Sequence, residues 1–266
     1  MKVEGFPLSV ERKSETYHDS RRRKIIMKVI VCKDYEEMSL RSARIVAAQI
    51  TVKPNCLLGF ATGSTPVGMY HKLAEMNQAG KIDFAEVKTV NLDEYYPIDP
   101  ANDQSYRYFM NKNLFDNINI KKENTNVPDG QAKDTEAEGN RYEALIASLG
   151  GIDLQVLGIG RNGHIGFNEP DSFLYNNTHV TGLTADTINA NARFFASEDD
   201  VPKHALTMGI GTILRAKKII ILINGKNKHE ALTRMLEGKL DPMCPASMLN
   251  VHPDVTVLCD EEAYNG

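Results

Sequence analysis

The stretch GIGRNGHIGFNEP, residues 158–170, contains side chains that can move protons. Histidine is the residue type whose unperturbed pKa lies near neutrality, and hydrogen bonds with Asn162 or Glu169 could orient the ring of His164. A G-x-G-x-x-G pattern is present, but the apolar helix that a dinucleotide site requires does not follow it. We interpret the stretch as a proton-transfer loop, the alternative being a structural histidine. Its glycines allow a sharp turn and close approach to a ligand: Gly158, Gly160 and Gly163.

A second acidic group stands in NLDEYYPID, where Asp93 and Glu94 follow an apolar run and precede Tyr95. A carboxylate at a strand end, partly shielded by aromatic rings, suits the abstraction of a proton next to a carbonyl or imine. The alternative is that the two acids are solvated or cap a helix. The pair is therefore a candidate catalytic base with a structural alternative.

The stretch ATGSTP, residues 61–66, predicts a phosphate site, because hydroxyls and free N–H groups at a helix start attract anions. It lacks the GK[ST] of a nucleotide-binding loop, and a helix cap without a ligand is the alternative. Lys228 stands near the start of a later helix, where it would either meet a phosphate or remain on the surface. Arg193 is ambiguous by itself. The candidate phosphate-binding residues of the loop are Thr62, Gly63, Ser64 and Thr65.

Short apolar runs alternate with segments of helical period from residue 27 onward. This alternation predicts a mostly parallel sheet with helices on both faces, whose ligands bind at the carboxyl ends of the strands. The expected strands lie within residues 28–32, 56–62, 87–93, 152–160, 217–225 and 254–260. The expected helices lie within residues 35–50, 65–80, 104–118, 134–150, 202–216 and 227–238.

The length, net charge and cysteine content of the chain favour a globular protein with a small-molecule partner. The chain has 266 residues and a formal net charge of -4, with both signs mixed along it, so neither nucleic acid nor a membrane surface is an expected partner. No apolar run reaches the ~18 residues of a membrane span. Four cysteines lack metal-ligand spacing, which predicts buried thiols, no metal and a cytoplasmic location: Cys32, Cys56, Cys244 and Cys259.

Residues 1–26 differ from the rest, being polar and aperiodic, with a basic cluster at 21–24. We expect a disordered or artificially added extension, although a basic contact arm or a further structural element is an alternative. Residues 27–266 are expected to form a single domain, because no linker divides them.

Six stretches agree with one known family in order and spacing, and the chain from about residue 27 to 260 resembles glucosamine-6-phosphate deaminases. They are ATGSTP, VNLDEYY, LGIGRNGHIGFNEP, NARFF, HALTMGIGTIL and INGKNK. The resemblance implies a Rossmann-like three-layer α/β/α sandwich with a mostly parallel central sheet. It also implies conversion of glucosamine 6-phosphate and water to fructose 6-phosphate and ammonia, in amino-sugar catabolism.

By matched motif, the resemblance implies that Asp93 moves a proton between C2 and C1 of the sugar. His164 would open the pyranose ring by relaying the anomeric proton to the ring oxygen, with Asn162 and Glu169 supporting it. Such proton transfers require no redox cofactor or metal, and none is expected. The implied substrate-binding residues are Thr62, Gly63, Ser64, Thr65, Glu94, Gly160, Arg193 and Lys228.

Two features differ from other members of that family. Some members have Asp where this chain has Asn162, which leaves Glu169 as the charged partner of the histidine. Allosterically regulated hexameric members carry basic residues after the NEP turn, where this chain has His179 and Thr181, and they extend further than Gly266. We therefore expect an unregulated enzyme that is a monomer or small homo-oligomer.

Two other function classes fit parts of the sequence. A sugar-phosphate lactonase on a related fold would share the phosphate loop and the Gly-x-Gly-x-x-Gly-His turn, but such enzymes usually lack the LDEY and FNEP pairing. A non-catalytic sugar-phosphate sensor would need an attached helix-turn-helix, and residues 1–26 are too short and unpatterned to supply one. The deaminase remains the favoured interpretation.

Overall fold

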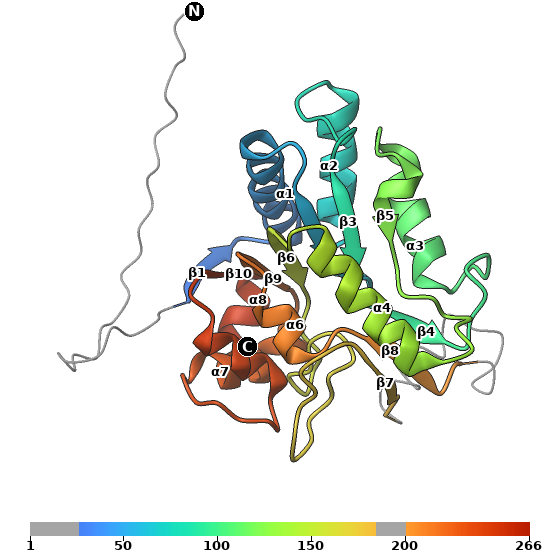
Figure 1. Ribbon diagram of the computed structural model, residues 1–266. Coiled ribbons are helices and arrows are strands. Elements are labelled where there is room, and N and C mark those ends of the chain that lie inside the picture. Colours follow the sequence, from blue (N-terminus) through green and yellow to red (C-terminus); the bar gives the residue numbers. More distant parts are fainter. Residues whose placement is uncertain (1–26, 185–200) are drawn as a thin grey trace, which may run out of the picture.

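The computed structural model describes residues 27–184 and 201–266, so residues 1–26 and Arg193 lie outside the described part of the chain. In that part, seven strands form one parallel sheet in the order β1-β10-β9-β6-β2-β3-β5 (Figure 1). Six of them coincide with predicted strands, whereas β5 has two residues and no apolar run marks it. The bounds are β1 Lys28–Cys32, β2 Leu57–Phe60, β3 Lys88–Asn91, β5 Thr125–Asn126, β6 Leu154–Leu157, β9 Ile219–Ile223 and β10 Val255–Asp260.

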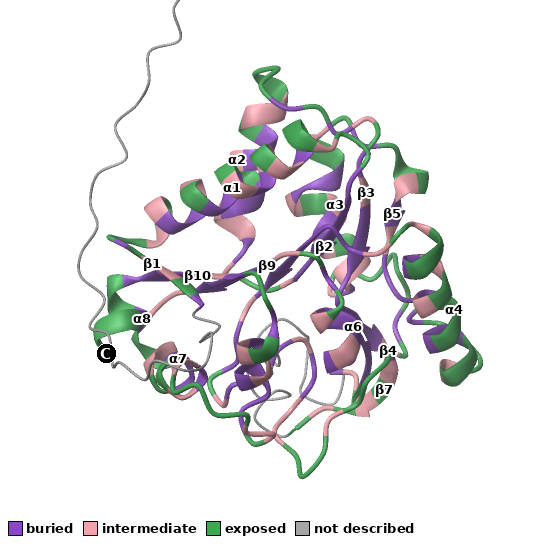
Figure 2. Cartoon of the chain, turned by 60° about the vertical axis from the view of Figure 1, so that its left-hand side comes forward, coloured by how far each residue is buried: buried purple, intermediate pink, exposed green. Residues whose placement is uncertain are grey.

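Helices cover both faces of this sheet, and Figure 2 shows the buried strands lying between them. One face packs against α1 (Tyr35–Val52), α2 (Val67–Gln78) and α3 (Tyr106–Asn113). The prediction of a Rossmann-like three-layer α/β/α sandwich is thus confirmed. The opposite face packs against α4 (Thr135–Ser148), α6 (Ile210–Leu214), α7 (His229–Leu236), α8 (Glu261–Asn265) and the 3₁₀ segment η5 (Pro245–Val251).

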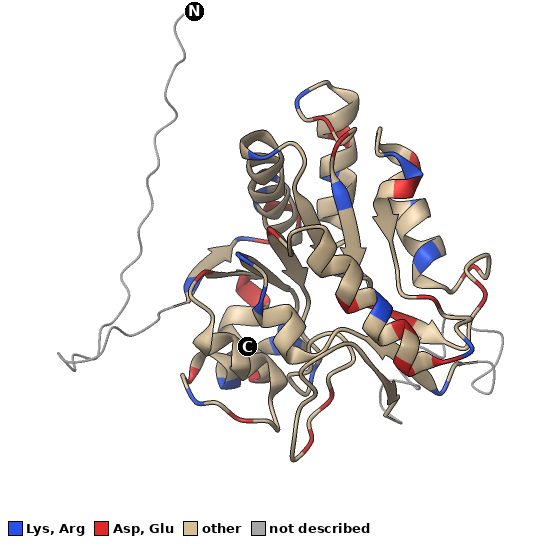
Figure 3. Cartoon of the chain, viewed as in Figure 1, with Lys and Arg blue, Asp and Glu red and all other residues tan. Residues whose placement is uncertain are grey.

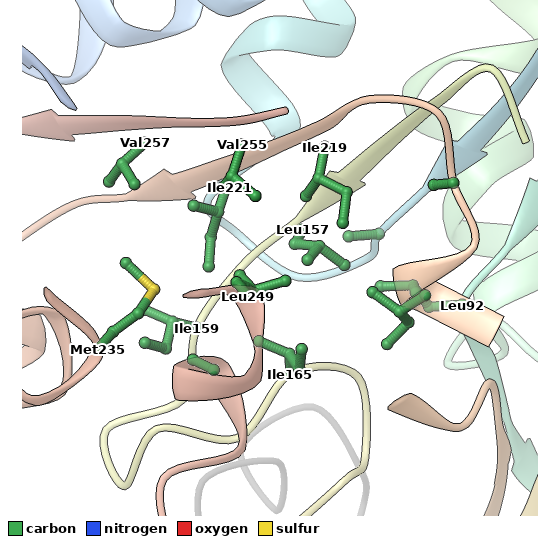
Figure 4. Close-up of a cluster of buried hydrophobic side chains, with 14 of the residues drawn as sticks. Leu92, Leu157, Ile159, Ile165, Ile219, Ile221, Met235, Leu249, Val255 and Val257 are labelled. Atoms are coloured by element: carbon green, nitrogen blue, oxygen red, sulfur yellow. The ribbon is translucent and has the colours of Figure 1, made fainter. Parts of the chain in front are cut away.

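Alternation along the central strands explains the two apolar cores. In β9, Ile219 and Ile221 point to the core on the α6–α8 face, whereas Ile220 and Leu222 point to the core on the α1–α3 face. Figure 4 shows the first of these cores, where β9 and β10 side chains meet those of η5. Because successive strand residues face opposite sides, a strand buried on both faces, such as β9, is predominantly apolar.

A second, antiparallel sheet of three strands was not predicted. It consists, among the described residues, of β4 (Asp93–Tyr96), β8 (His204–Thr207) and β7 (His179–Gly182), with β8 in the middle. The chain passes from β3 into β4 through the single residue Leu92. Asp93, expected at the end of a strand of the main sheet, is therefore the first residue of a strand in the second sheet.

The helix expected within residues 202–216 is wrong in its first half. Residues His204–Thr207 form β8, and the helix α6 begins only at Ile210. Backbone pairing of β8 with β4 and β7 outweighs the helical spacing of the apolar residues, and the Met208 N–H donates to the Leu92 carbonyl at 2.7 Å. Gly209 then precedes α6, where a side chain would collide with the Asn177 carbonyl.

The surface and the cysteines agree with the composition. Figure 3 shows that acidic and basic positions are interspersed along the helices. All four cysteines are free and buried, as predicted. Among the residues that the structure describes, no helix has both the length and the apolar character needed to cross a bilayer.

Candidate active site

The candidate residues follow four strands that are neighbours in the main sheet, in the order β9, β6, β2 and β3. Because parallel strands end at the same edge, the loops after them must lie side by side. These segments are residues 224–228 after β9, 158–170 after β6, 61–66 after β2, and β4 after β3. The topology therefore brings the candidate proton-transfer and phosphate-binding stretches to one edge.

His164 and Glu169 form a hydrogen-bonded pair within the 158–170 loop. The imidazole Nδ1 lies 3.1 Å from Glu169 Oε2, and the Asn162 side-chain amide donates to the same oxygen at 2.7 Å. The side-chain oxygen Oδ1 of Asn162 in turn accepts from the backbone N–H of His164 at 3.2 Å. An ionised Glu169 favours the proton on Nδ1, which leaves Nε2 as the basic nitrogen.

The asparagine at position 162 has a physical role in this arrangement. Its amide can donate to Glu169 and accept from His164 at the same time, which an ionised aspartate cannot do. A carboxylate there would also place a second negative charge beside Glu169. Asn162 therefore leaves the carboxylate of Glu169 as the charged partner of the imidazole.

Close packing sets the position of the His164 ring. A Cβ atom added to Gly160 would lie 2.3 Å from the ring, so the imidazole rests directly on the glycine backbone. Gly163 has a φ of +91° and would collide with Cys244 if it had a side chain, while its carbonyl accepts from the Ala246 N–H at 2.8 Å. The start of η5 thus packs against the 158–170 loop and restricts its position.

We expect Gly160→Ala to lower kcat/KM by about 10²-fold, because the added methyl group must push the imidazole away from Glu169. Steady-state kinetics of ammonia release would measure the loss. Gly182→Ala is a matched control, since Gly182 is an exposed strand residue with open space around its Cβ position. Wild-type kinetics in Gly160→Ala would show that the ring does not depend on this contact.

Asp93 is a buried carboxyl group beside this loop. Its side chain is almost fully buried, and a Cβ atom on Gly166 would lie 3.5 Å from Asp93 Oδ2, so the carboxyl faces the loop of His164. Burial, and secondarily the nearby charge of Glu94, raises the pKa of Asp93 from 3.8 to about 8. A carboxyl group with a pKa near neutrality is well matched to proton transfer in either direction.

The raised pKa has a measurable effect on stability. Between the unfolded pKa, near 4, and about 8, the folded state retains a proton that the unfolded state has lost, so stability falls as pH rises. We expect Asp93→Asn to melt at a higher temperature than wild type at pH 8 and at nearly the same temperature at pH 4. Thermal melts from pH 4 to 9 would test this, with the exposed Asp103→Asn as control. A gap that widens toward acid pH would contradict it.

Glu94 points away from Asp93 and binds backbone N–H groups. Its Oε1 accepts from the N–H of Tyr95 at 2.9 Å and of Tyr106 at 2.8 Å, while Oε2 accepts from the N–H of Arg107 at 2.9 Å. Burial raises the pKa of Glu94 to about 7, less than that of its neighbour, because these donors favour the ionised form. The structure therefore does not place Glu94 with the expected substrate-binding residues. It caps α3.

The phosphate-loop candidates are linked to the neighbouring segments. Thr65 Oγ1 donates to Asn224 Oδ1 at 2.7 Å, which joins the loop after β2 to the end of β9. Lys228 Nζ donates to the Ile159 carbonyl at 2.7 Å, between two glycines of the 158–170 loop. Burial, and secondarily Arg161, lowers the pKa of Lys228 from 10.5 to about 8. An anion bound nearby would restore its charge.

The centre of the ATGSTP stretch is more exposed than the residues on either side of it. Gly63 has a φ of +93° and open space around it, and both Gly63 and Ser64 are exposed. Thr62 and Thr65 are half-buried. The loop therefore presents a free backbone turn with flanking hydroxyls, a suitable shape for an anion.

Three features that surround the candidate site were not predicted from the sequence. Tyr106 packs on Tyr95, Asn224 binds Thr65, and the start of η5 around Cys244 packs against the 158–170 loop. Asn224 follows a predicted strand and could have been found by the rule that selected the other residues. The other two act through packing between distant segments, for which the sequence has no local signal.

A parallel α/β fold with a buried carboxyl and a histidine–carboxylate pair at one edge of its sheet is the arrangement of a Rossmann-like enzyme. The chain belongs to the family described as glucosamine-6-phosphate isomerases/6-phosphogluconolactonase, whose model matches residues 35–258.

Relatives and solved structures agree with this membership. The chain is 56% identical over 237 residues to a glucosamine-6-phosphate deaminase of Thermoanaerobacter pseudethanolicus, covering 89% of this chain and 94% of that one. A deaminase of Clostridioides difficile is 54% identical over 237 residues, covering 89% and 95%. A solved monomeric glucosamine-6-phosphate deaminase superimposes with a TM-score of 0.88 at 50% identity, covering 90% and 99%. A 6-phosphogluconolactonase of Thermotoga maritima, at 22% identity and a TM-score of 0.70 over 88% and 100%, shares the fold.

Proposed function

We propose that this enzyme converts glucosamine 6-phosphate and water to fructose 6-phosphate and ammonia. The observation that carries the proposal is the buried Asp93 carboxyl beside the loop of the His164–Glu169 pair. The Asp93 carboxyl suits proton transfer at carbon, and the His164–Glu169 pair suits proton transfer at oxygen. The names of relatives that are more than half identical over most of the chain support the same substrate.

In the proposed first step, His164 opens the pyranose ring. Its Nε2 takes the proton from the anomeric hydroxyl and delivers it to the ring oxygen as the C1–O5 bond breaks, leaving a C1 aldehyde. Glu169 stabilises the transient imidazolium through Nδ1. Histidine and substrate together gain and lose no proton, so the histidine ends neutral.

In the second step, ionised Asp93 takes the C2 proton and returns it to C1. The C2–H electrons form the C1=C2 bond, the C1 carbonyl electrons move to O1, and O1 takes a proton from the C2 ammonium group, which gives the enolamine. When Asp93 then protonates C1, the nitrogen lone pair forms a protonated C2 imine beside the C1 alcohol. Water then adds to the imine carbon and ammonia leaves, which completes fructose 6-phosphate. The loop at 61–66, Lys228 and Arg193 are proposed to hold the 6-phosphate, so that binding energy remote from C1 and C2 fixes these carbons against Asp93.

The competing function within the family is hydrolysis of a sugar-phosphate lactone. That reaction is an attack of water on a carbonyl and needs no base directed at a C–H bond. The desolvated Asp93 carboxyl, whose pKa is raised to about 8, is better suited to a carbon acid. The deaminase proposal is preferred for this reason.

The direct test is ammonia release from glucosamine 6-phosphate by the purified chain, with glucosamine and N-acetylglucosamine 6-phosphate as controls. We expect ammonia and fructose 6-phosphate in equal amounts from the first compound alone. A folded protein that releases no ammonia but hydrolyses 6-phosphogluconolactone would overturn the proposal.

The proposed enzyme is unregulated by acetylated amino-sugar phosphate. His179, at a position where regulated members are basic, stacks on Tyr175 at 4.2 Å between ring centroids and has Nδ1 3.0 Å from the Asn177 carbonyl. Its pKa is lowered, chiefly by burial, so the ring is neutral at pH 7. A neutral, stacked imidazole is a weak ligand for a phosphate dianion.

We expect a hyperbolic dependence of rate on glucosamine 6-phosphate, unchanged by N-acetylglucosamine 6-phosphate. Initial-rate curves with and without the acetylated sugar would test this. A sigmoidal curve that the effector makes hyperbolic would show a regulatory site elsewhere. We also propose a monomer or small oligomer in the cytoplasm, which light scattering and cell fractionation would test.

A further inference from the structure

Asn224 is a polar residue that lies directly beside the proposed phosphate loop. It follows Ile223, the last residue of the buried strand β9, and it is half-buried. Its Oδ1 accepts the hydroxyl proton of Thr65 at 2.7 Å. Thr65 follows β2, and only β6 separates β9 from β2 in the main sheet. The contact therefore crosses the edge of the sheet at which the 158–170 loop begins.

The turn that carries Asn224 is anchored to the neighbouring strand. The N–H of Gly225 donates to both carboxylate oxygens of Asp260, each at 3.0 Å, and Gly225 has a φ of +85°, which favours glycine. Asp260 is buried at the end of β10, and its Oδ1 also accepts from the N–H of Ala263 at 2.8 Å. The backbone from which the Asn224 side chain projects is thus fixed by β10 and the start of α8.

The hydroxyl proton of Thr65 is already used in this arrangement. A hydroxyl has one proton to donate, and Thr65 donates it to Asn224 Oδ1. The oxygens of a phosphate dianion are acceptors, so they need donors from the protein. While the bond to Asn224 is kept, the Thr65 side chain cannot supply one of these donors.

The amide of Asn224 has donors to offer at the same place. Its Nδ2 carries two N–H groups, and it makes no hydrogen bond within residues 27–184 and 201–266. Because Oδ1 and Nδ2 are bonded to one carbon, the bond from Thr65 to Oδ1 also keeps Nδ2 next to the 61–66 loop. A half-buried side chain leaves these donors within reach of a ligand.

We propose that Asn224 binds the 6-phosphate directly, with the Thr65 hydroxyl fixing the amide and Nδ2 donating a hydrogen bond to a phosphate oxygen. This inference rests on the proposed function in that it assigns the 61–66 loop to a phosphate. The side chain of Thr65 becomes an orienting group, while the backbone N–H groups of the loop and Lys228 remain donors to the phosphate. Asn224 adds a neutral donor from a different strand end.

The test compares Asn224→Leu, which removes the amide but keeps a side chain of similar size, with wild type. We expect the Kd for inorganic phosphate, measured by titration calorimetry, and the KM for glucosamine 6-phosphate to rise by about 10-fold. The kcat should stay near wild type, because the phosphate lies at the end of the sugar away from C1 and C2. Asn227→Leu is the matched control, since Asn227 is an exposed residue of the same segment, and it should change neither constant. An unchanged phosphate Kd in Asn224→Leu would overturn the proposal.

Two further variants separate direct binding from support of Thr65. Asn224→Asp keeps an oxygen that accepts from Thr65 but has no N–H donor, so it should bind phosphate at least as weakly as Asn224→Leu. In a Thr65→Val background, Asn224→Leu should still raise the phosphate Kd by about 5-fold, because Nδ2 contacts the phosphate without the hydroxyl. No further loss in that background would mean that Asn224 acts only through Thr65. That result, or wild-type affinity in Asn224→Asp, would overturn the proposal.

Phosphate binding keeps this test distinct from that of the reaction. If wild type binds inorganic phosphate but releases no ammonia, the proposed reaction fails while the comparison of phosphate affinities still decides the role of Asn224. If wild type releases ammonia and Asn224→Leu keeps the wild-type phosphate Kd and KM, the Asn224 proposal fails by itself.

Discussion

Replacing Asp93 by asparagine is expected to reduce kcat for glucosamine 6-phosphate by about 10³-fold or more, with KM nearly unchanged. The carboxyl group is proposed to carry the C2 proton to C1, and an amide of the same shape cannot accept that proton. General acid–base groups typically contribute ~10²–10⁴-fold, and no other ionisable side chain is proposed to face C2. Binding depends on groups at the other end of the sugar, so it should survive.

Two measurements separate loss of the base from loss of the fold. Ammonia release gives the rate, and incorporation of solvent deuterium at C1 of fructose 6-phosphate reports the proton transfer itself. The raised pKa of Asp93 implies that the variant melts at a higher temperature than wild type at pH 8, so an inactive but stabilised protein is the expected combination. Deuterium exchange at the wild-type rate would assign the base to another residue.

The main sheet could be predicted because its strands are buried on both faces. A run such as Ile219–Ile223 has no polar position, and helical segments capped by residues such as Asp34 or Asp134 stand between such runs. Burial on two faces and the right-handed connection of parallel strands leave few alternative topologies. Local sequence therefore determined the layers and the edge at which the ligand residues meet.

The second sheet could not be predicted in the same way. The segment His204–Thr207 contains helix-compatible residues, and its strand conformation comes from pairing with β4, more than 100 positions earlier in the chain. The pairing also affects the site, because Thr207 Oγ1 accepts from the Phe167 N–H at 3.1 Å and the Met208 carbonyl accepts from Asn168 at 2.8 Å. The misassigned segment thus supports the loop that carries Glu169.

The site residues likewise divide into those that local sequence predicts and those whose position depends on contacts with distant segments. The pairing of His164 with Glu169 could be predicted because the two residues are only five positions apart in one loop. Glycines in that loop allow the turn that brings their side chains together. The family resemblance implied a substrate-binding role for Glu94, the residue after Asp93 in the sequence. In a strand, however, adjacent residues face opposite sides, and the opposite side here meets the start of α3.

The second large effect is expected for His164→Gln. Glutamine can still hydrogen-bond to Glu169, but it cannot take the anomeric proton and return it to the ring oxygen. We expect kcat/KM for glucosamine 6-phosphate to fall by about 10²–10³-fold. An open-chain analogue that lacks the hydroxyl needed to close the pyranose ring should lose less than about 5-fold, because it bypasses the step that the histidine serves.

Glu169→Gln completes the test of this pair. The variant keeps a side chain of the same size, but an amide stabilises an imidazolium less than the carboxylate that lies 3.1 Å from Nδ1. Its defect should therefore have the same preference for the closed ring as that of His164→Gln, and be smaller. If both variants impaired closed-ring and open-chain substrates equally, the pair would act in binding or in holding the loop, and another group would have to open the ring.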